Sequence, residues 1–166
     1  MGLSLNIGSG DRPMKVINGH KCINIDIRDM HNHPKYKEAV FVLGDVRSMP
    51  FDDTCFDVIL AHDIIEHFPI TDTVAVLKEW CRVLKTGGLL NFRTPDLDWV
   101  ARHYIKNKDA KFISYHIFGG QNYSDNFHYV IFDEQWLLSL CADAGLYYVS
   151  SNKNHSNFDL IVRKGL

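Results

Sequence analysis

Short runs of apolar and β-branched residues recur along the chain, and stretches with helical spacing separate several of them. Runs of this length, bounded by turn residues, predict buried or half-buried β-strands. They cover residues 3–7, 22–27, 40–43, 56–61, 88–93, 146–150 and 158–163. Because strands that alternate with helices pack into a sheet covered by helices, the pattern predicts an α/β fold.

The clearest helical pattern begins near Thr71. Its apolar residues fall on one helix face, and they are Val74, Leu77, Cys81 and Leu84. We expect Gly87 and Gly88 to end this helix, because glycine favours helix C-termini. A second helix is predicted from Asp133 to Gly145, and a third over residues 97–106.

These elements predict one domain over residues 1–166, with a Rossmann-like, doubly wound and mostly parallel sheet and helices on both faces. The first crossover departs from that pattern. It comprises residues 11–21 and contains Pro13 and Gly19. A parallel connection takes about a dozen residues, so we expect a shortened first crossover without the usual helix.

A glycine turn follows the first predicted strand. Gly8 and Gly10 can adopt backbone angles closed to other residues, and they leave space for a ligand. Asp26 ends the next strand, where its carboxylate would face two ribose hydroxyls. This arrangement suits a nucleoside-containing cofactor. Pro13 stands where a dinucleotide fingerprint has its third glycine, which disfavours a nicotinamide or flavin cofactor and hence a dehydrogenase or epimerase.

Several segments in order resemble the class I S-adenosylmethionine-dependent methyltransferases, specifically the type 11 group. They are LNIGSG, NID, GDVRSMPF, AHDIIEHF and RVLKTGG, and they span about residues 3–95. A weaker similarity, over 118–121 and 128–145, is to a subgroup of small predicted methyltransferases associated with surface-polysaccharide genes.

The resemblance implies that the cofactor is S-adenosylmethionine, and it implies a role for each matching residue. Gly8, Ser9 and Gly10 would line the methionine and ribose portion, and Asp26 would hold the ribose hydroxyls. Ile27 would pack on the adenine, and Asp45 and Val46 would hold its edge. Ala61 and His62 would lie under the sulfonium through backbone contacts.

Charge and cysteine content narrow the range of partners and compartments. Lys and Arg total 18 against 20 Asp and Glu, and no segment gathers positive charge, so we expect no nucleic-acid partner. No apolar stretch reaches membrane-spanning length, so we expect no membrane partner. The 4 cysteines are far apart in apolar contexts. We therefore expect buried free thiols and a reduced, cytoplasmic compartment. The oligomeric state is left open.

Methyl transfer to a hydroxyl calls for a general base, and imidazole suits that role near neutral pH. We assign His67 and His128 as catalytic candidates, facing the methyl group from opposite sides, with Tyr123 a weaker candidate. His128 follows a loop rich in Gly, Asn and Tyr, and we expect a substrate lid within residues 108–132. The expected activity is O-methylation of a small molecule or saccharide. The alternative is a non-catalytic accessory subunit that binds S-adenosylmethionine.

Asp63, Glu66 and His67 have two interpretations. Their spacing suits a helix start, with Asp63 as the cap and Glu66 at the positive helix end. The segment DIIEH also resembles the Glu-x-x-Glu-His metal motif of certain oxygen-methylating enzymes, which makes a divalent metal the alternative. We favour the capping interpretation and assign no metal ligand.

Overall fold

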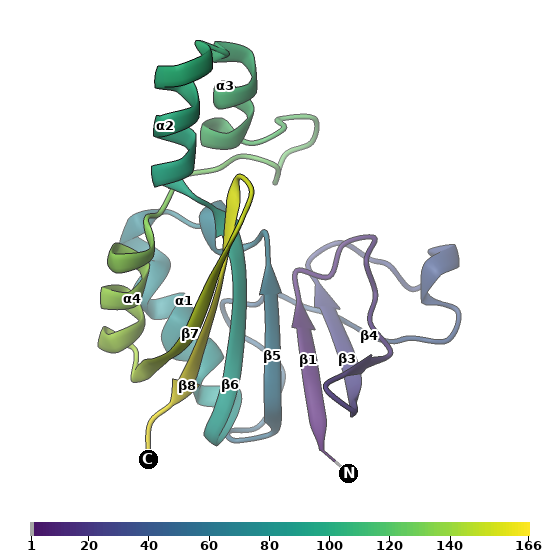
Figure 1. Ribbon diagram of the computed structural model, residues 1–166. Helices are drawn as coiled ribbons and strands as arrows, with labels where there is room; N and C mark the ends of the chain where they lie inside the picture. Colours follow the sequence, from purple (N-terminus) through teal and green to yellow (C-terminus); the bar gives the residue numbers. More distant parts are fainter. Residues whose placement is uncertain (1) are drawn as a thin grey trace.

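The strands of the computed structural model, which describes residues 2–166, form one twisted sheet (Figure 1). Its central strands are β1 (Leu3–Ile7), β3 (His20–Asp26), β4 (Val40–Leu43), β5 (Phe56–His62) and β6 (Leu84–Pro95), and they pair in parallel in the order β4-β3-β1-β5-β6. The hairpin of β7 (Leu146–Asn154) and β8 (Asn157–Lys164) joins antiparallel to β6, and β2 (Val16–Ile17) pairs with β3. The predicted α/β class with a mostly parallel sheet is confirmed.

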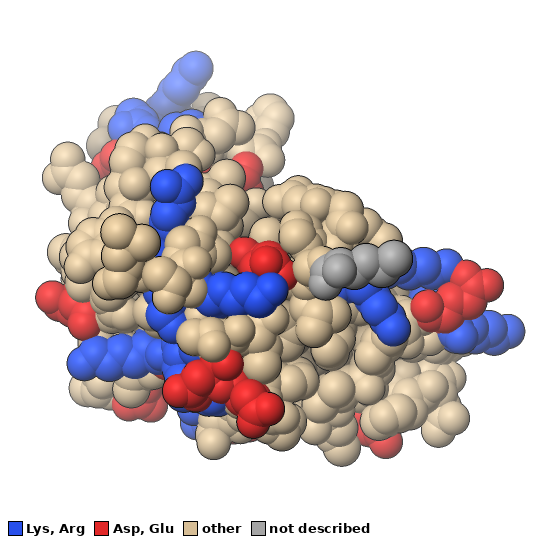
Figure 2. Space-filling view, turned by 90° about the horizontal axis from the view of Figure 1, so that it is seen from below, with Lys and Arg blue, Asp and Glu red and all other residues tan. Residues whose placement is uncertain are grey.

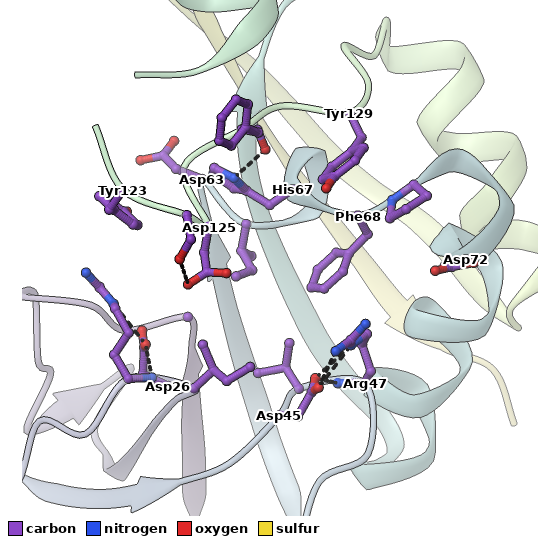
Figure 3. Close-up of a pocket in the computed structure, with 18 residues that line it drawn as sticks. Asp26, Asp45, Arg47, Asp63, His67, Phe68, Asp72, Tyr123, Asp125 and Tyr129 are labelled. Carbon is purple, nitrogen blue, oxygen red and sulfur yellow. Dashed lines mark hydrogen bonds and ion pairs between the residues drawn. The ribbon is translucent and has the colours of Figure 1, made fainter. Parts of the chain in front are cut away.

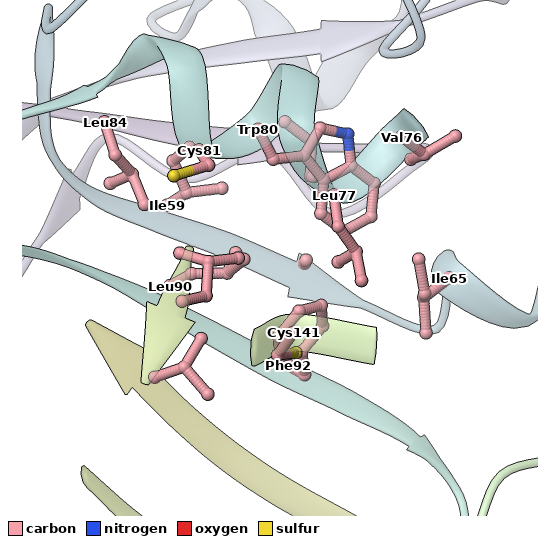
Figure 4. Packing of buried hydrophobic residues seen from close by; sticks show 14 of the residues in the cluster. Ile59, Ile65, Val76, Leu77, Trp80, Cys81, Leu84, Leu90, Phe92 and Cys141 are labelled. Atoms are coloured by element: carbon pink, nitrogen blue, oxygen red, sulfur yellow. The ribbon is translucent and has the colours of Figure 1, made fainter. Parts of the chain in front are cut away.

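Two helices, α1 (Ile70–Val83) and α4 (Glu134–Asp143), cover one face of the sheet. Trp80 and Leu77 of α1 are fully buried against strand residues such as Phe92 (Figure 4). The indole of Trp80 also donates to the carbonyl of Val46, 3.0 Å away, and so ties the β4–β5 connection to the helix. This layer contains most of the hydrophobic core.

The residues at the ends of α1 and α4 explain where these helices begin and end. Asp133 accepts from the amide of Trp136 at 2.7 Å and starts α4, as expected. Helix α1 ends at Val83, earlier than expected, because the backbone of Leu84 is extended and leads directly into β6. Gly87 therefore lies in a strand, and it does not end the helix.

The second face of the sheet differs from the expectation of helices on both faces. Among residues 2–166, no α-helix covers it over β1 and β3, where the short first crossover lies instead. Two buried side-chain amides hold this crossover. Asn24 accepts from the amide of Met14 at 2.8 Å and donates to the carbonyl of Met14 at 2.9 Å, while Asn6 donates to the carbonyl of Arg12 at 3.0 Å. The two asparagines also bond to each other at 3.0 Å. Side chains thus supply partners that a helix would have supplied to its own backbone.

Helices α2 (Leu97–Asn107) and α3 (Ala110–Phe118) stand beyond the carboxyl ends of the strands (Figure 1). The sequence predicted α2 but not α3. Aromatic rings join the two helices, because the ring of Phe112 in α3 is centred 5.7 Å from that of Trp99 and 4.8 Å from that of His103 in α2. The chain then returns to the sheet through residues 119–131, at the edge where the glycine turn lies.

The surface shows no segregation of charge on the side seen in Figure 2, where basic and acidic side chains lie close beside one another. Ion pairs such as Lys85–Asp57, at 2.8 Å, account for part of this mixing. Within residues 2–166, no helix combines the length and the apolar character that crossing a bilayer demands.

Replacing Asn24 with alanine should destabilise the fold. The substitution leaves the backbone groups of Met14 and the carbonyl of Val40 without their amide partner, so the unfolding free energy should fall by about 2–4 kcal/mol. Urea denaturation of the variant measures this change. Asn107→Ala, at an exposed helix end, is the matched control and should change stability little. Equal stability of the two variants would contradict the role given to Asn24.

Candidate functional site

Two adjoining cavities lie at the carboxyl ends of the central strands. The smaller, of about 330 Å³, brings together five of the predicted cofactor-binding residues: Gly8, Asp26, Ile27, Asp45 and Val46. In Figure 3, Asp26 and Asp45 lie along one side of it, with Tyr123, Asp125 and His67 across from them. The larger, of about 560 Å³, contains Gly8, Ser9, Gly10, His62, His67 and His128. Ala61 lines neither cavity, because its side chain is fully buried in the core.

The glycine turn has the backbone that the sequence predicts. Gly8 and Gly10 have φ angles of 59° and 48°, in the left-handed region. A Cβ atom on Gly8 would come within 2.4 Å of Ile64, and one on Gly10 within 2.8 Å of the Arg28 guanidinium. Neither position accommodates a side chain without a shift of its neighbour.

Tyr36 supports this turn, although no motif in the sequence pointed to this residue. It lies in η1 (Pro34–Tyr36), a single 3₁₀ turn between β3 and β4, and is only 4% exposed. Its hydroxyl donates to the carbonyl of Gly10 at 2.7 Å and accepts from the hydroxyl of Ser9 at 2.7 Å. The aromatic ring thereby replaces part of the support that a first-crossover helix would give.

Asp26 joins the turn to the tip of β3. One carboxylate oxygen accepts from the amide of Gly10 at 2.7 Å, and the other accepts from the amide and the Nε of Arg28, at 2.9 and 3.2 Å. The Arg28 guanidinium also lies over the ring of Tyr123, 5.2 Å from its centre. Asp26 therefore has part of its hydrogen-bonding capacity left for a ligand, and Arg28 stands between this acid and the loop above it.

Asp45 is more fully engaged than the sequence suggested. Arg47 donates to both of its oxygens, from the backbone amide at 2.8 Å and from the guanidinium at 2.6 Å. These hydrogen bonds hold the pKa of Asp45 below its usual range. Ile27, 57% exposed, supplies an apolar surface in the same cavity. Ile27, Asp45 and the buried Val46 thus line one cavity.

Asp63 does not cap a helix, contrary to the favoured interpretation. It has a φ of 55°, and its carboxylate pairs with Arg93 through two hydrogen bonds and with Arg12 at 3.2 Å. The turn that follows, η2 (Ile65–His67), begins at Ile64 without a side-chain cap from residues 2–166. Strained backbone of this kind, fixed by ion pairs, is frequent at functional sites.

Glu66 is a buried carboxylate, 1% exposed, and it does not sit at a solvated helix end. One of its oxygens accepts from the hydroxyl of Thr94 at 3.1 Å, and the other has no hydrogen-bond partner among the described residues. Burial raises the pKa of Glu66 to about 8. The Nε2 atom of His62 is also buried and has no hydrogen-bond partner within residues 2–166, and burial lowers the pKa of this imidazole.

His67 and His128 meet beside Glu66, although 60 positions separate them in sequence. Their rings lie edge to face with centres 4.8 Å apart, on one side of the cavity and not on opposite sides as expected. The Nδ1 of His67 contacts the carbonyl of Phe127, and that of His128 contacts the carbonyl of His116, both at 2.9 Å. Because a carbonyl only accepts, each Nδ1 carries a proton and each Nε2 presents a lone pair. Burial lowers the pKa of both imidazoles, which favours this neutral form.

Comparison with known proteins shows which protein family this chain resembles. A model described as "Methyltransferase domain" matches residues 5–92, which is more than half of the chain. An uncharacterized methyltransferase of Schizosaccharomyces pombe is 36% identical over 63 residues, which are 38% of this chain and 22% of the relative. The match thus spans about a fifth of the length of that curated relative.

Solved structures agree with the fold. A putative methyltransferase of Haloferax volcanii, solved in complex with the Trm112 methyltransferase activator, aligns over 99% of this chain and 83% of its own, with a TM-score of 0.73 and 15% identity. The 1,6-didemethyltoxoflavin-N1-methyltransferase of Burkholderia thailandensis, solved with bound 1,6-didemethyltoxoflavin and S-adenosylhomocysteine, aligns over 99% of this chain and 72% of its own, with a TM-score of 0.67 and 14% identity.

Removing the hydroxyl of Tyr36 should loosen the glycine turn. In Tyr36→Phe the carbonyl of Gly10 loses its donor, so the unfolding free energy should fall by about 1–2 kcal/mol and the Gly10 amide should exchange faster. Hydrogen exchange and urea denaturation check both effects. Tyr148→Phe, at a residue 57% exposed, is the control. Unchanged exchange at Gly10 would show that the hydroxyl does not hold the turn.

Proposed function

We propose that this chain, which belongs to the methyltransferase-domain family and whose cofactor is S-adenosylmethionine, transfers the methyl group of that cofactor to an oxygen atom of a small molecule or saccharide. The observation that carries this proposal is the position of two neutral imidazoles, His67 and His128, in the cavity that the glycine turn also lines. A base is needed when the acceptor is a hydroxyl.

The adenosyl portion fits the smaller cavity. Asp26 would accept from the ribose hydroxyls at the place where Arg28 Nε now donates, so the guanidinium would yield or share this oxygen. Ile27 and Val46 would enclose the adenine, and Asp45 would meet its edge. The methionine portion would follow the turn of Gly8 and Gly10, whose missing side chains leave room for it.

Bound S-adenosylmethionine supplies a methyl group that a sulfonium already activates, so the protein mainly has to orient the acceptor and exclude water. The Nε2 lone pairs of His67 and His128 can take the acceptor's proton at the start of the transfer. Tyr115, Tyr123 and Asn126 line the same cavity and offer ring faces and an amide, which suit a saccharide or another polar ring. We propose that the segment 108–132 closes over the acceptor as a lid.

Asp26→Asn should weaken cofactor binding. The amide cannot accept at both positions, and a charge-assisted hydrogen bond to the ribose is lost, so the affinity should fall by about 2–4 kcal/mol. Because Asp26 also holds the amides of Gly10 and Arg28, circular dichroism must accompany the titration. Asp29→Asn, at an acid on the protein surface, is the control and should bind S-adenosylhomocysteine normally. Normal affinity in a folded Asp26→Asn protein would exclude the ribose role.

His67→Gln and His128→Gln should lower the transfer rate and leave cofactor affinity unchanged. Loss of a general base costs about 10²–10⁴-fold in rate. Transfer of the labelled methyl group from S-adenosylmethionine to an extract of small molecules and saccharides provides the assay. His155→Gln, at an exposed turn residue, is the control. Cofactor binding without any labelled acceptor would favour the non-catalytic accessory subunit, and full activity in both variants would exclude the base.

A further inference from the structure

The carboxylate of Glu66 lacks a partner that a buried acid requires. Its Oε1 has no hydrogen bond within residues 2–166, and the residue is 1% exposed. A buried charge without compensation is costly, so such a group is neutral, paired or bound to a metal. Arg93 is a nearby cation, but its guanidinium is engaged by the carboxylate of Asp63. Glu66 lines the larger cavity together with His67 and His128.

The two imidazoles are held as ligands are held in metal sites. Histidines that bind a metal commonly donate their other ring N–H to a backbone carbonyl, which fixes the tautomer and the ring orientation. His67 and His128 both do so, through the carbonyls of Phe127 and His116 at 2.9 Å. Each Nε2 therefore offers its lone pair.

We propose that Glu66, His67 and His128 bind one divalent transition-metal ion. One ligand atom from each of these residues lies within 4.8 Å of the other two. Bonds of about 2.0–2.2 Å to a common ion require ligand atoms somewhat closer than this, so the side chains must converge by roughly 1 Å. Asp63, which the sequence motif offered as a ligand, is withdrawn by its ion pairs with Arg93 and Arg12.

The donor set indicates which class of ion fits. Two imidazole nitrogens and one carboxylate oxygen suit Zn²⁺, Co²⁺, Fe²⁺ or Mn²⁺, whereas Mg²⁺ prefers an all-oxygen shell. Two imidazoles and a carboxylate leave at least one coordination position open, as in catalytic zinc sites. Because Glu66, His67 and His128 line the larger cavity, an acceptor bound in that cavity could reach an ion held by them.

The ion would refine the role of the two histidines. In the ion-loaded protein the imidazoles are ligands, and the ion makes an acceptor hydroxyl more acidic. In the ion-free protein they act as bases. This use of the ion rests on the proposed function, whereas the binding of the ion does not.

The test is direct titration of the full chain, stripped of metals by a chelator, with Zn²⁺ and with Co²⁺. We expect one ion per chain in calorimetry, a Co²⁺ visible spectrum typical of nitrogen and oxygen ligands, and no Mg²⁺ binding at the same concentrations. Glu66→Gln, His67→Gln and His128→Gln should each weaken binding by about 100-fold or more, since even indirect supports of a metal ligand are worth about 10–100-fold. His155→Gln should bind normally.

Two outcomes would overturn the ion site. The first is that the wild-type protein binds no ion at a ratio of one per chain, and the second is that the three ligand variants bind the ion as tightly as the wild-type protein does. Glu66→Gln retains the shape and the hydrogen bond from Thr94, and circular dichroism shows whether each variant is folded. Titration of the same protein with S-adenosylhomocysteine separates this proposal from the proposed function. If the protein binds the ion but not S-adenosylhomocysteine, the ion site is supported and the proposed methyl transfer is refuted. If it binds S-adenosylhomocysteine but no ion, the ion site is refuted and the proposed methyl transfer is unaffected.

Discussion

The backbone between β1 and β3 must satisfy its polar groups without a helix, and the arrangement of the site depends on how it does so. Residues 11–21 are too few for the usual crossover, so side chains take the place of helical hydrogen bonds. Asn24 pairs with both polar groups of Met14, and Tyr36 reaches under the turn to the carbonyl of Gly10. These contacts come from strand β3 and from the turn after it, so the ligand-binding turn is fixed to its neighbouring strand.

This support makes Asp26 both a structural residue and a binding residue. Its carboxylate holds the amide of Gly10 while it faces the smaller cavity. A hydrogen bond of 2.7 Å therefore joins the turn directly to the acid. Where the first crossover contains a helix, that helix can hold the glycine turn in place. In this chain Asp26 helps to hold the turn instead. The short first crossover is thus compatible with an ordered binding site.

Local patterns in the sequence predicted most of the strands and the α/β class. The resemblance to a methyltransferase family added Ile27 and Val46 to the predicted residues of the smaller cavity. Gly8, Gly10 and Asp26 lie at strand ends, where sequence position alone determines which residues share an edge. The positions of a second set of site residues depend on tertiary contacts between segments that are far apart in the sequence. No local pattern shows that His128 packs against His67, that Tyr36 lies under the turn, or that Asp63 prefers Arg93 to a helix end. Helix α3 was missed because its apolar residues point to all sides of the helix and form no one-sided pattern, and rings from α2 hold it in place.

The loop after α3 is bound to the rest of the protein by few backbone contacts near the site, among them the amide of Tyr129 to the carbonyl of Glu66 at 2.9 Å. His128 precedes that contact, whereas His67 and Glu66 belong to the turn after β5. The three-residue cluster is therefore divided between a fixed part and a part carried by the loop. Lifting the loop would take one imidazole away and undo the cluster at the same moment that the cavity opens. The cavity would then be open to a ligand only while the cluster is apart, and the cluster would be assembled only while the cavity is closed. A single segment of the chain would control both states.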